Sequence, residues 1–365
     1  MAFGFTGLAP QIVIGLVSIV VIVFSAEKVV ERMQSVAKSF GVSEVVIGMT
    51  IISIGTSLPE ISVHMVGSLN ILNNPAAINE ISGTVLGMNI GSDVIQQTLI
   101  MGTVVVLASV MKGRNHFVFT RDFIKRDYFP MVAAHLLVLS MALNGTLSRF
   151  EGVLLVTVFA GYIYYLYSKR GEKLLRHGDA EPSEKPWTDL GVGILGMAFL
   201  IYFSDIFLGV VETLIAETGI SGSMIGVTTI GLVSAMPEFF TALSAVRKGA
   251  EGLSLGTLIG SNITNPLMGI GIGAAISSYT IPRPLILWDL PVQAGTAIVL
   301  ITYLWNREKI GDLLAPFFRK TGMNNTATKF EESENGVLTV IGGLLLVLLY
   351  FVYIIIRATY FQADF

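Results

Sequence analysis

The 365-residue chain contains no cysteine, so disulfide bonds and thiolate metal sites are both excluded. Charged residues are also scarce, at 13% of the sequence, compared with roughly 25% in a typical soluble domain. The sequence has no H-E-x-x-H zinc motif and no constellation of His, Asp and Ser. We therefore expect that the chain is not an enzyme. The charged run at 169–185 lacks the ligand spacing of an EF-hand, so a calcium-binding loop is not expected there.

Apolar residues dominate the chain instead. They make up 53% of the sequence, and the mean hydropathy is +0.72. Several apolar stretches approach or exceed the ~20 residues that a helix needs to cross a bilayer. Examples are 11–26, 129–143, 152–167, 285–305 and 337–356. Alternating strands of about ten residues, the signature of a membrane β-barrel, do not occur. The sequence therefore predicts an all-α polytopic membrane protein.

Ten transmembrane helices are expected from the apolar segments. Their approximate ranges are 10–37, 44–70, 79–110, 127–144, 150–168, 188–217, 222–247, 252–277, 285–305 and 336–357. The first segment has no basic region before it, so we read it as a retained helix, not a signal peptide. With the N-terminus outside, 20 of the 23 Lys and Arg residues face the cytoplasm. Only Arg149, Arg283 and Arg357 remain on the outer side. Both termini are thus expected outside.

The two halves of the chain repeat each other. With an offset of 178 positions, Glu60 aligns with Glu238 and Pro59 with Pro237. With an offset of 169, G-M-N-I-G-S at 87–92 matches G-T-L-I-G-S at 256–261. Five helices per half is an odd number, so the two repeats must be inverted in the membrane. We predict a first five-helix repeat at 1–168, a cytoplasmic connection at 169–187 and a second repeat at 188–365.

Each repeat carries a Pro-Glu pair inside its second helix. The segment 55–60 reads G-T-S-L-P-E, and the segment 233–238 reads V-S-A-M-P-E. Proline has no amide hydrogen, so we expect the second and seventh helices to be broken at these points. The carbonyls that are freed persist within a membrane only where protein buries them or where they line a wet cavity. Carbonyl and carboxylate oxygens are good ligands for hard cations. The paired motifs therefore predict a cation site at the bilayer midplane.

The third and eighth helices are expected to complete this site. Ser92 and Gln96 are four residues apart and share one helix face, as do Ser261 and Asn265. An all-oxygen site with two formal negative charges suits Ca²⁺ or several Na⁺ ions better than Zn²⁺. Alternative roles for these side chains are hydrogen bonds back to helix carbonyls and contacts between helices without an ion.

These motifs resemble the α-repeats of the Ca²⁺/cation antiporter superfamily, close to the prokaryotic Na⁺/Ca²⁺ exchangers. The family pattern is G-T-S-L-P-E followed by G-N-x-x-G-S-N-x-x-N/D. By this resemblance, Glu60 and Glu238 bind Ca²⁺ and also Na⁺. Further side-chain oxygens are implied at Thr56, Ser57, Ser92, Ser234 and Ser261, and main-chain carbonyl ligands at Ser53 and Gly231. In the family, the first and sixth helices are thought to slide across the remaining core.

The chain departs from the family pattern at three positions of the site. Ala235 replaces a motif serine, which removes one hydroxyl from the second half. Gln96 and Asn265 occupy the positions where family members often carry an Asp. Asp93 adjoins Ser92 but points roughly 100° around the helix from it, so it is not among the predicted ligands. These departures leave the coupling ion and the stoichiometry open.

The combined prediction is a secondary active antiporter that exchanges Na⁺ for Ca²⁺ by alternating access. We expect no cofactor and no nucleic-acid partner; the lipid bilayer surrounds the chain, and a prokaryotic plasma membrane is its expected location. One alternative is H⁺/Ca²⁺ exchange, for which His64, one turn after Glu60, is a candidate proton relay. Others are Na⁺-coupled export of another divalent cation, such as Mg²⁺ or Mn²⁺, and a channel. The sequence does not indicate an oligomeric state.

Overall fold

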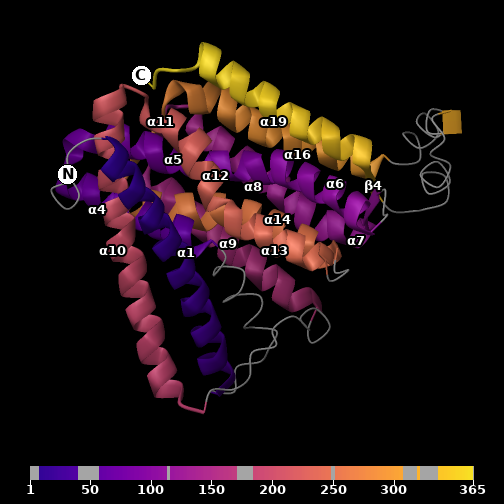
Figure 1. Ribbon diagram of the computed structural model, residues 1–365, viewed down its shortest axis with the longest axis horizontal. Helices are drawn as coiled ribbons and strands as arrows, with labels where there is room; N and C mark the ends of the chain where they lie inside the picture. Colours follow the sequence, from indigo (N-terminus) through magenta and orange to yellow (C-terminus); the bar gives the residue numbers. More distant parts are fainter. Residues whose placement is uncertain are drawn as a thin grey trace.

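The computed structural model describes residues 8–39, 57–112, 116–170, 184–247, 251–306, 319–320 and 336–364, and most of these are helical (Figure 1). The helices are α1 (Leu8–Ser39), α4 (Leu58–Asn73), α5 (Ile78–Ile95), α6 (Met101–Lys112), α7 (Arg121–Phe123), α8 (Phe129–Ala142), α9 (Arg149–Arg170), α10 (Pro186–Thr218), α11 (Gly222–Ile225), α12 (Gly231–Ser234), α13 (Met236–Arg247), α14 (Glu251–Thr264), α15 (Gly271–Ile276), α16 (Leu290–Trp305) and α19 (Val340–Tyr360).

Short irregular segments join several of these helices into longer ones. A 3₁₀ turn at Pro75–Ala77 leads into α5. π-helical segments occur at Gln96–Ile100, Ile124–Tyr128, Gly226–Ile230, Asn265–Ile270 and Leu285–Asp289. The π-helical segments at Gln96 and Asn265 begin at positions that the repeat offset of 169 makes equivalent. The two halves therefore share the same local irregularity in their third helices.

Within the described parts of the chain, six helical stretches are long and apolar enough to cross a membrane by length and composition. They are Pro75–Met111, Arg149–Leu166, Pro186–Thr218, Gly222–Phe240, Leu285–Trp305 and Val340–Tyr360. The predicted class, a predominantly helical protein with membrane-spanning helices, is confirmed. The count of ten spans and the inverted repeat stay predictions.

Helices α1 and α10 form a pair that crosses the other helices at a steep angle (Figure 1). They run antiparallel: Arg32 of α1 pairs with Asp189 of α10 at 2.8 Å, whereas Gly15 lies against Val210. Two hydrogen bonds connect α10 to α4: a buried one between Ser62 and Ser204 at 2.8 Å and an exposed one from Asn70 to Asp205 at 3.0 Å. The pair thus packs across the second helix of the first half.

The second and third helices of each half pack against those of the other half. Helix α4 contacts α15, and α13 contacts α6. Helix α5 lies directly on the backbone of α11, α12 and the π-helical segment between them. A Cβ atom added to Gly91 would lie 2.5 Å from the Cα atom of Val227, so only glycine permits this approach. A Cβ added to Gly87 would likewise lie 2.6 Å from the carbonyl oxygen of Ser223, whereas one added to the repeat-equivalent Gly256 or Gly260 would meet nothing within 4 Å.

The seventh helix is interrupted where the sequence predicts it. Helix α12 ends at Ser234, Ala235 forms a turn, and α13 starts at Met236. Pro237 has no amide to offer the carbonyl of Val233, so the helical hydrogen-bond ladder is broken at this point. In the first half, α4 starts at Leu58, directly before Pro59. The rest of the expected second helix, 44–56, lies outside the described residues.

Two short antiparallel strand pairs fasten the loops at the ends of the bundle. Strand β1 (His116–Phe119) pairs with β4 (Gly336–Thr339), and β2 (Thr146–Leu147) pairs with β3 (Tyr279–Thr280). The side chains of Phe117, Phe119 and Leu338 are buried. Each pair connects a loop of the first half with a loop of the second half.

A buried ion pair anchors α19. Arg357, counted in the sequence as an outer charge, is fully buried, and its Nε donates to Asp289 at 2.8 Å. Tyr353 donates to the same carboxylate at 2.6 Å, and Arg357 also donates to Ser223. The backbone amide of Ser223 donates to Asp364 at 3.0 Å. This network ties α19 and the C-terminal residues to the start of α11.

We predict that Arg357→Met destabilises the protein by about 3–5 kcal/mol, because it leaves the Asp289 carboxylate buried without its cation. Thermal unfolding of the detergent-purified protein would measure the loss of stability as a lower midpoint temperature. Arg149→Met is the matched control, since Arg149 is exposed, and should change stability by no more than ~0.5 kcal/mol. Equal midpoints for the two variants would show that the buried pair does not stabilise the fold.

Candidate functional site

The two motif glutamates lie in the interior with no hydrogen-bond partner among the described residues. Glu60 opens α4, Glu238 opens α13, and each side chain is 1% exposed. All four of their carboxylate oxygens lack a hydrogen bond. The two carboxylates are close enough to interact electrostatically. Two unsatisfied carboxylates at this depth are unfavourable unless a cation or protons neutralise them.

Gln96 joins the third and eighth helices through hydrogen bonds. Its amide nitrogen donates to Ser92 at 3.1 Å. Its amide oxygen accepts from Ser261 and, at 3.0 Å, from Asn262. The predicted residues Ser92, Gln96 and Ser261 are therefore brought together and buried. Both residues that donate to the amide oxygen of Gln96 belong to the second half of the chain.

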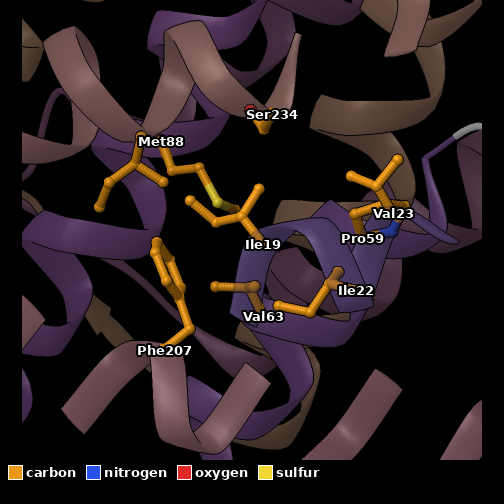
Figure 2. Close-up of a pocket in the computed structure, with 9 residues that line it drawn as sticks. Ile19, Ile22, Val23, Pro59, Val63, Met88, Phe207 and Ser234 are labelled. Carbon is orange, nitrogen blue, oxygen red and sulfur yellow. The ribbon is translucent and has the colours of Figure 1, made fainter. Parts of the chain in front are cut away.

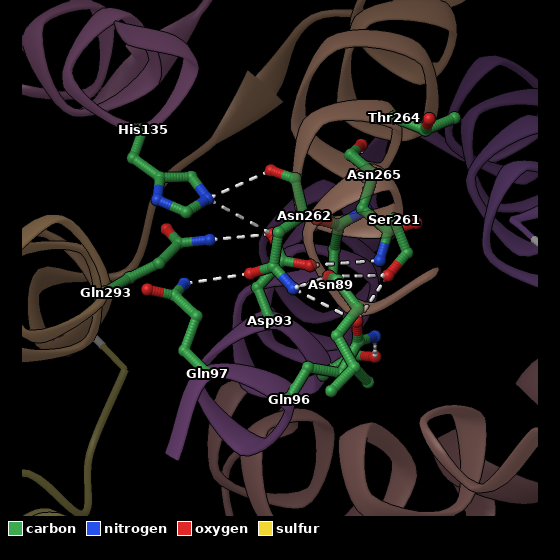
Figure 3. Close-up of polar contacts among 12 residues, drawn as sticks. Asn89, Asp93, Gln96, Gln97, His135, Ser261, Asn262, Thr264, Asn265 and Gln293 are labelled. Carbon is green, nitrogen blue, oxygen red and sulfur yellow. Dashed lines mark hydrogen bonds and ion pairs between the residues drawn. The ribbon is translucent and has the colours of Figure 1, made fainter. Parts of the chain in front are cut away.

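Asp93 is a third buried acid at the same place, and the sequence reasoning omitted it. Its carboxylate accepts from the amide of Asn265 at 3.0 Å and from that of Gln293 at 2.7 Å (Figure 3). It interacts electrostatically with both Glu60 and Glu238. A charged residue inside an apolar helix is by itself a signal of function, and this signal was present in the sequence.

A wider polar cluster surrounds Asp93. The Nε2 atom of His135 lies 3.8 Å from the Asp93 carboxylate and donates to the carbonyl of Asn262 at 3.1 Å. Gln97 donates to the side chain of Asn262 at 2.8 Å, and Asn89 donates to the carbonyl of Asn265 at 3.1 Å. None of these residues was predicted from the sequence. The motif G-S-N at 260–262 contains Asn262, which was the one available signal for it.

The remaining predicted residues lie on the broken-helix side of the site. Gly231 packs against Ser92: a Cβ added to it would lie 2.8 Å from the Ser92 amide nitrogen. Ser234 donates to the carbonyl of Gly231 at 3.2 Å, and it lies beside Glu60. Ser57 is fully buried, and its hydroxyl has no partner among the described residues. Ser53 and Thr56 fall outside the described residues.

A small apolar cavity of about 20 Å³ separates this region from the α1–α10 pair (Figure 2). Pro59 and Ser234 line it on the site side, and Ile19, Ile22 and Phe207 line it on the side of the pair. The volume is about that of a single water molecule. In this conformation the inner surface of α1 that faces Pro59 is therefore apolar.

The donor set fits a hard cation better than a soft one. The clustered side chains offer carboxylate, hydroxyl and amide oxygens, which Ca²⁺ and Na⁺ prefer. Among the described residues, no group of three or more His, Asp and Glu side chains is arranged so as to hold a metal ion. A cation held here would therefore need hydroxyl, amide or carbonyl oxygens in addition to the carboxylates.

His64 is held by a hydrogen-bond cluster on α4. Its Nδ1 lies 3.1 Å from the hydroxyl of Tyr279, which also contacts Ser68 at 2.7 Å. Ser68 donates to the carbonyl of Gly273 at 2.8 Å. These contacts fasten α4 to α15, and they give His64 a packing function whether or not it carries protons.

A family model described as "Sodium/calcium exchanger protein" matches residues 10–168 and 188–359 of the chain. Inner membrane protein YrbG of Escherichia coli is 27% identical over 302 residues, covering 80% of this chain and 88% of that protein. Sodium/calcium exchanger MaX1 of Methanosarcina acetivorans is 25% identical over 329 residues, covering 79% and 89% respectively. The similarity therefore extends over most of the chain.

Two solved exchangers share the fold. The crystal structure of the H⁺/Ca²⁺ exchanger CAX gives a TM-score of 0.66 at 16% identity and covers 97% of this chain and 83% of that one. The sodium-calcium exchanger NCX_Mj gives a TM-score of 0.56 at 19% identity, with coverages of 97% and 99%. At these identities the comparison establishes the fold alone.

We predict that Gly91→Ala destabilises the protein by about 1–3 kcal/mol and impairs ion binding, since the new methyl group would collide with the backbone at Val227. Thermal unfolding and Ca²⁺ binding by calorimetry would measure the two effects. Gly161→Ala, in α9, is the matched control, because a Cβ there meets nothing within 4 Å. If Gly91→Ala were as stable as Gly161→Ala, the close contact between α5 and the π-helical segment Gly226–Ile230 would not be needed for stability.

Proposed function

Because the chain belongs to the sodium/calcium exchanger protein family, we propose that it is an integral membrane antiporter that exchanges Na⁺ for Ca²⁺ by alternating access. The resemblance read from the paired Pro-Glu motifs is thereby confirmed at the level of the family. The observation that carries the proposal is the pair of buried carboxylates, Glu60 and Glu238, whose oxygens have no partner among the described residues. Transport requires no covalent chemistry from the chain.

We propose that Glu60 and Glu238 bind the transported ion together. Each comes from a different half of the chain, and each lies in the first turn of a helix, directly after a proline. The hydroxyls of Ser57 and Ser234 and the carbonyl of Gly231 lie on the same side of the site and are proposed as further ligands. Ser92, Ser261, Gln96 and Asn265 are proposed to close it from α5 and α14, and Ser53 and Thr56 from the segment before Ser57.

Coupling between the two ions follows from the charge of this site. Two bare carboxylates are costly to expose to an apolar interior, so the helices can rearrange only when cations neutralise them. Either one Ca²⁺ or more than one Na⁺ supplies sufficient charge. The site then changes sides when it is loaded with either ion, which is the requirement for exchange.

We propose that the α1–α10 pair is the element that moves. Apolar side chains form the cavity between this pair and the site, and they offer little resistance to sliding. The ion pair between Arg32 and Asp189 holds the two helices together at one end. The hydrogen bonds of α10 to Ser62 and Asn70 would have to break and re-form as the pair moves.

The proposed topology has ten spanning helices in two inverted repeats, at 1–168 and 188–365, with both termini outside. The start of α1 and the end of α19 lie at the same end of the molecule (Figure 1), which supports an even number of spans. The repeated π-helical segments at Gln96 and Asn265 support the internal repeat.

A proton-coupled Ca²⁺ exchanger is the second candidate. Gln96 and Asn265 are neutral amides at positions where a carboxylate would add negative charge. Without that charge the site has less to offer several Na⁺ ions, and this favours coupling to protons. Export of another divalent cation, such as Mg²⁺ or Mn²⁺, is compatible with the same oxygen ligands.

We predict that Glu60→Gln and Glu238→Gln each reduce Na⁺-driven uptake of ⁴⁵Ca²⁺ into proteoliposomes to the background of protein-free liposomes. Each substitution removes one of the two charges that bind the ion while preserving side-chain size. Glu217→Gln is the matched control, because Glu217 is an exposed residue of α10 and its loss should leave uptake unchanged. Wild-type rates in either site variant would refute the assignment of that carboxylate.

We also predict that ⁴⁵Ca²⁺ uptake follows an outward Na⁺ gradient and not a K⁺ or H⁺ gradient. Liposomes loaded with each ion in turn, and diluted into medium lacking it, would make the comparison in one preparation. Uptake driven by a pH gradient without Na⁺ would instead establish proton coupling. Competition by Mg²⁺ or Mn²⁺ in the same assay would identify the preferred divalent cation.

A further inference from the structure

The two amide side chains at repeat-equivalent positions, Gln96 and Asn265, are oriented in opposite ways. The amide oxygen of Gln96 accepts hydrogen bonds from Ser261 and Asn262. The amide oxygen of Asn265 is buried and has no partner among the described residues. Gln96 therefore uses its oxygen within the protein, whereas Asn265 keeps its oxygen available.

The residues that contact these amides explain the difference. The repeat offset of 169 makes Asp93 equivalent to Asn262. The amide nitrogen of Asn262 donates a hydrogen bond to the amide oxygen of Gln96 at 3.0 Å. A carboxylate can only accept hydrogen bonds. Asp93 consequently accepts a hydrogen bond from the amide nitrogen of Asn265 at 3.0 Å. The amide oxygen of Asn265 is left without a partner among the described residues.

Asp93 is itself fixed in place on its other side. Its second oxygen accepts from Gln293 of α16 at 2.7 Å. His135 of α8 lies 3.8 Å away and is held by the carbonyl of Asn262 (Figure 3). Asn89 bonds the main-chain carbonyl of Asn265 at 3.1 Å, so the backbone that carries Asn265 is anchored too. Both members of the Asp93–Asn265 pair thus have little freedom to rotate.

We propose that Asp93 is a positioning residue that turns the amide oxygen of Asn265 toward the transported cation. Asn265 is then the amide ligand of the site, and Gln96 acts as a bridge between α5 and α14. The inference rests on the proposed function, since it assigns a role in binding the same cation. Its physical basis is that polar neighbours hold metal ligands in the orientation that binding needs. Loss of such a neighbour typically weakens binding by about 10–100-fold.

A double-mutant cycle tests this role with Ca²⁺ as the probe. Asp93→Asn replaces one acceptor oxygen by a donor, so Asn265 can turn its nitrogen toward the ion. We expect the half-saturating Ca²⁺ concentration for Na⁺-driven uptake to rise by about 10–100-fold, with a smaller change in maximal rate. Asn265→Ala should produce a loss of the same order. Because Asp93 acts through Asn265, the double variant should be no worse than the more affected single variant.

The exchanged pair, Asp93→Asn with Asn265→Asp, is the rescue variant. It restores one amide and one carboxylate that face each other, with a carboxylate oxygen now available as the ligand. We expect its half-saturating Ca²⁺ concentration to lie well below that of Asp93→Asn alone. Size-exclusion chromatography of each variant in detergent would show that the protein is folded, and the exchanged pair keeps the test valid if Asp93→Asn does not fold.

Three results would overturn the proposal. One is a wild-type Ca²⁺ affinity in Asp93→Asn. Another is a double variant whose loss equals the product of the single losses, which would make Asp93 an independent ligand. The third is a folded exchanged pair no better than Asp93→Asn. Failure of the proposed function looks different, because the wild-type protein would then show neither Ca²⁺ uptake nor Ca²⁺ binding.

Discussion

The rest of the structure depends on how the bundle accommodates the carboxylates of Glu60 and Glu238 in its interior. Burying one ion in a protein costs several kcal/mol even after the surroundings relax. Neither carboxylate has a hydrogen bond from a described residue to offset this cost. Asp93 adds a third acid within electrostatic reach. Such a centre is favourable only when cations or protons neutralise it, and the cations that the chain is proposed to transport would do so.

Small residues and broken helices make that centre accessible to main-chain oxygens. Gly91 and Gly231 let α5 and α12 approach until their backbones touch. Pro237 and the turn at Ala235 interrupt the seventh helix at the level of Glu238. Gln96 then links α5 with α14 across the two halves. Each half thus supplies one of the two motif glutamates, and hydrogen bonds from Gln96 to Ser261 and Asn262 join the two halves.

The features that could be predicted from the sequence are those with a local cause. Pro237 removes an amide hydrogen whatever surrounds it, so the break in the seventh helix followed directly. The positions of Gln96 and Ser92 followed from helical periodicity. The resemblance supplied the family, whose model matches both halves of the chain. None of this depends on which other helices lie nearby.

The features that were missed have tertiary causes. Asp93 was left out because it points away from Ser92. That reasoning assumed that only one face of the helix meets the site. Every residue from Ile81 to Ile95 is in fact buried, so the opposite face meets Asn265 and Gln293. Arg357 was considered only for its side of the membrane, and its buried contact with Asp289, 68 residues earlier in the chain, was not predicted.

The most direct test of the central claim is a crystal structure of the protein grown with Ca²⁺. We predict a single Ca²⁺ in each chain, about 2.3–2.6 Å from oxygens of both Glu60 and Glu238. A Ca²⁺ that contacts only one of these carboxylates, or neither, would contradict it.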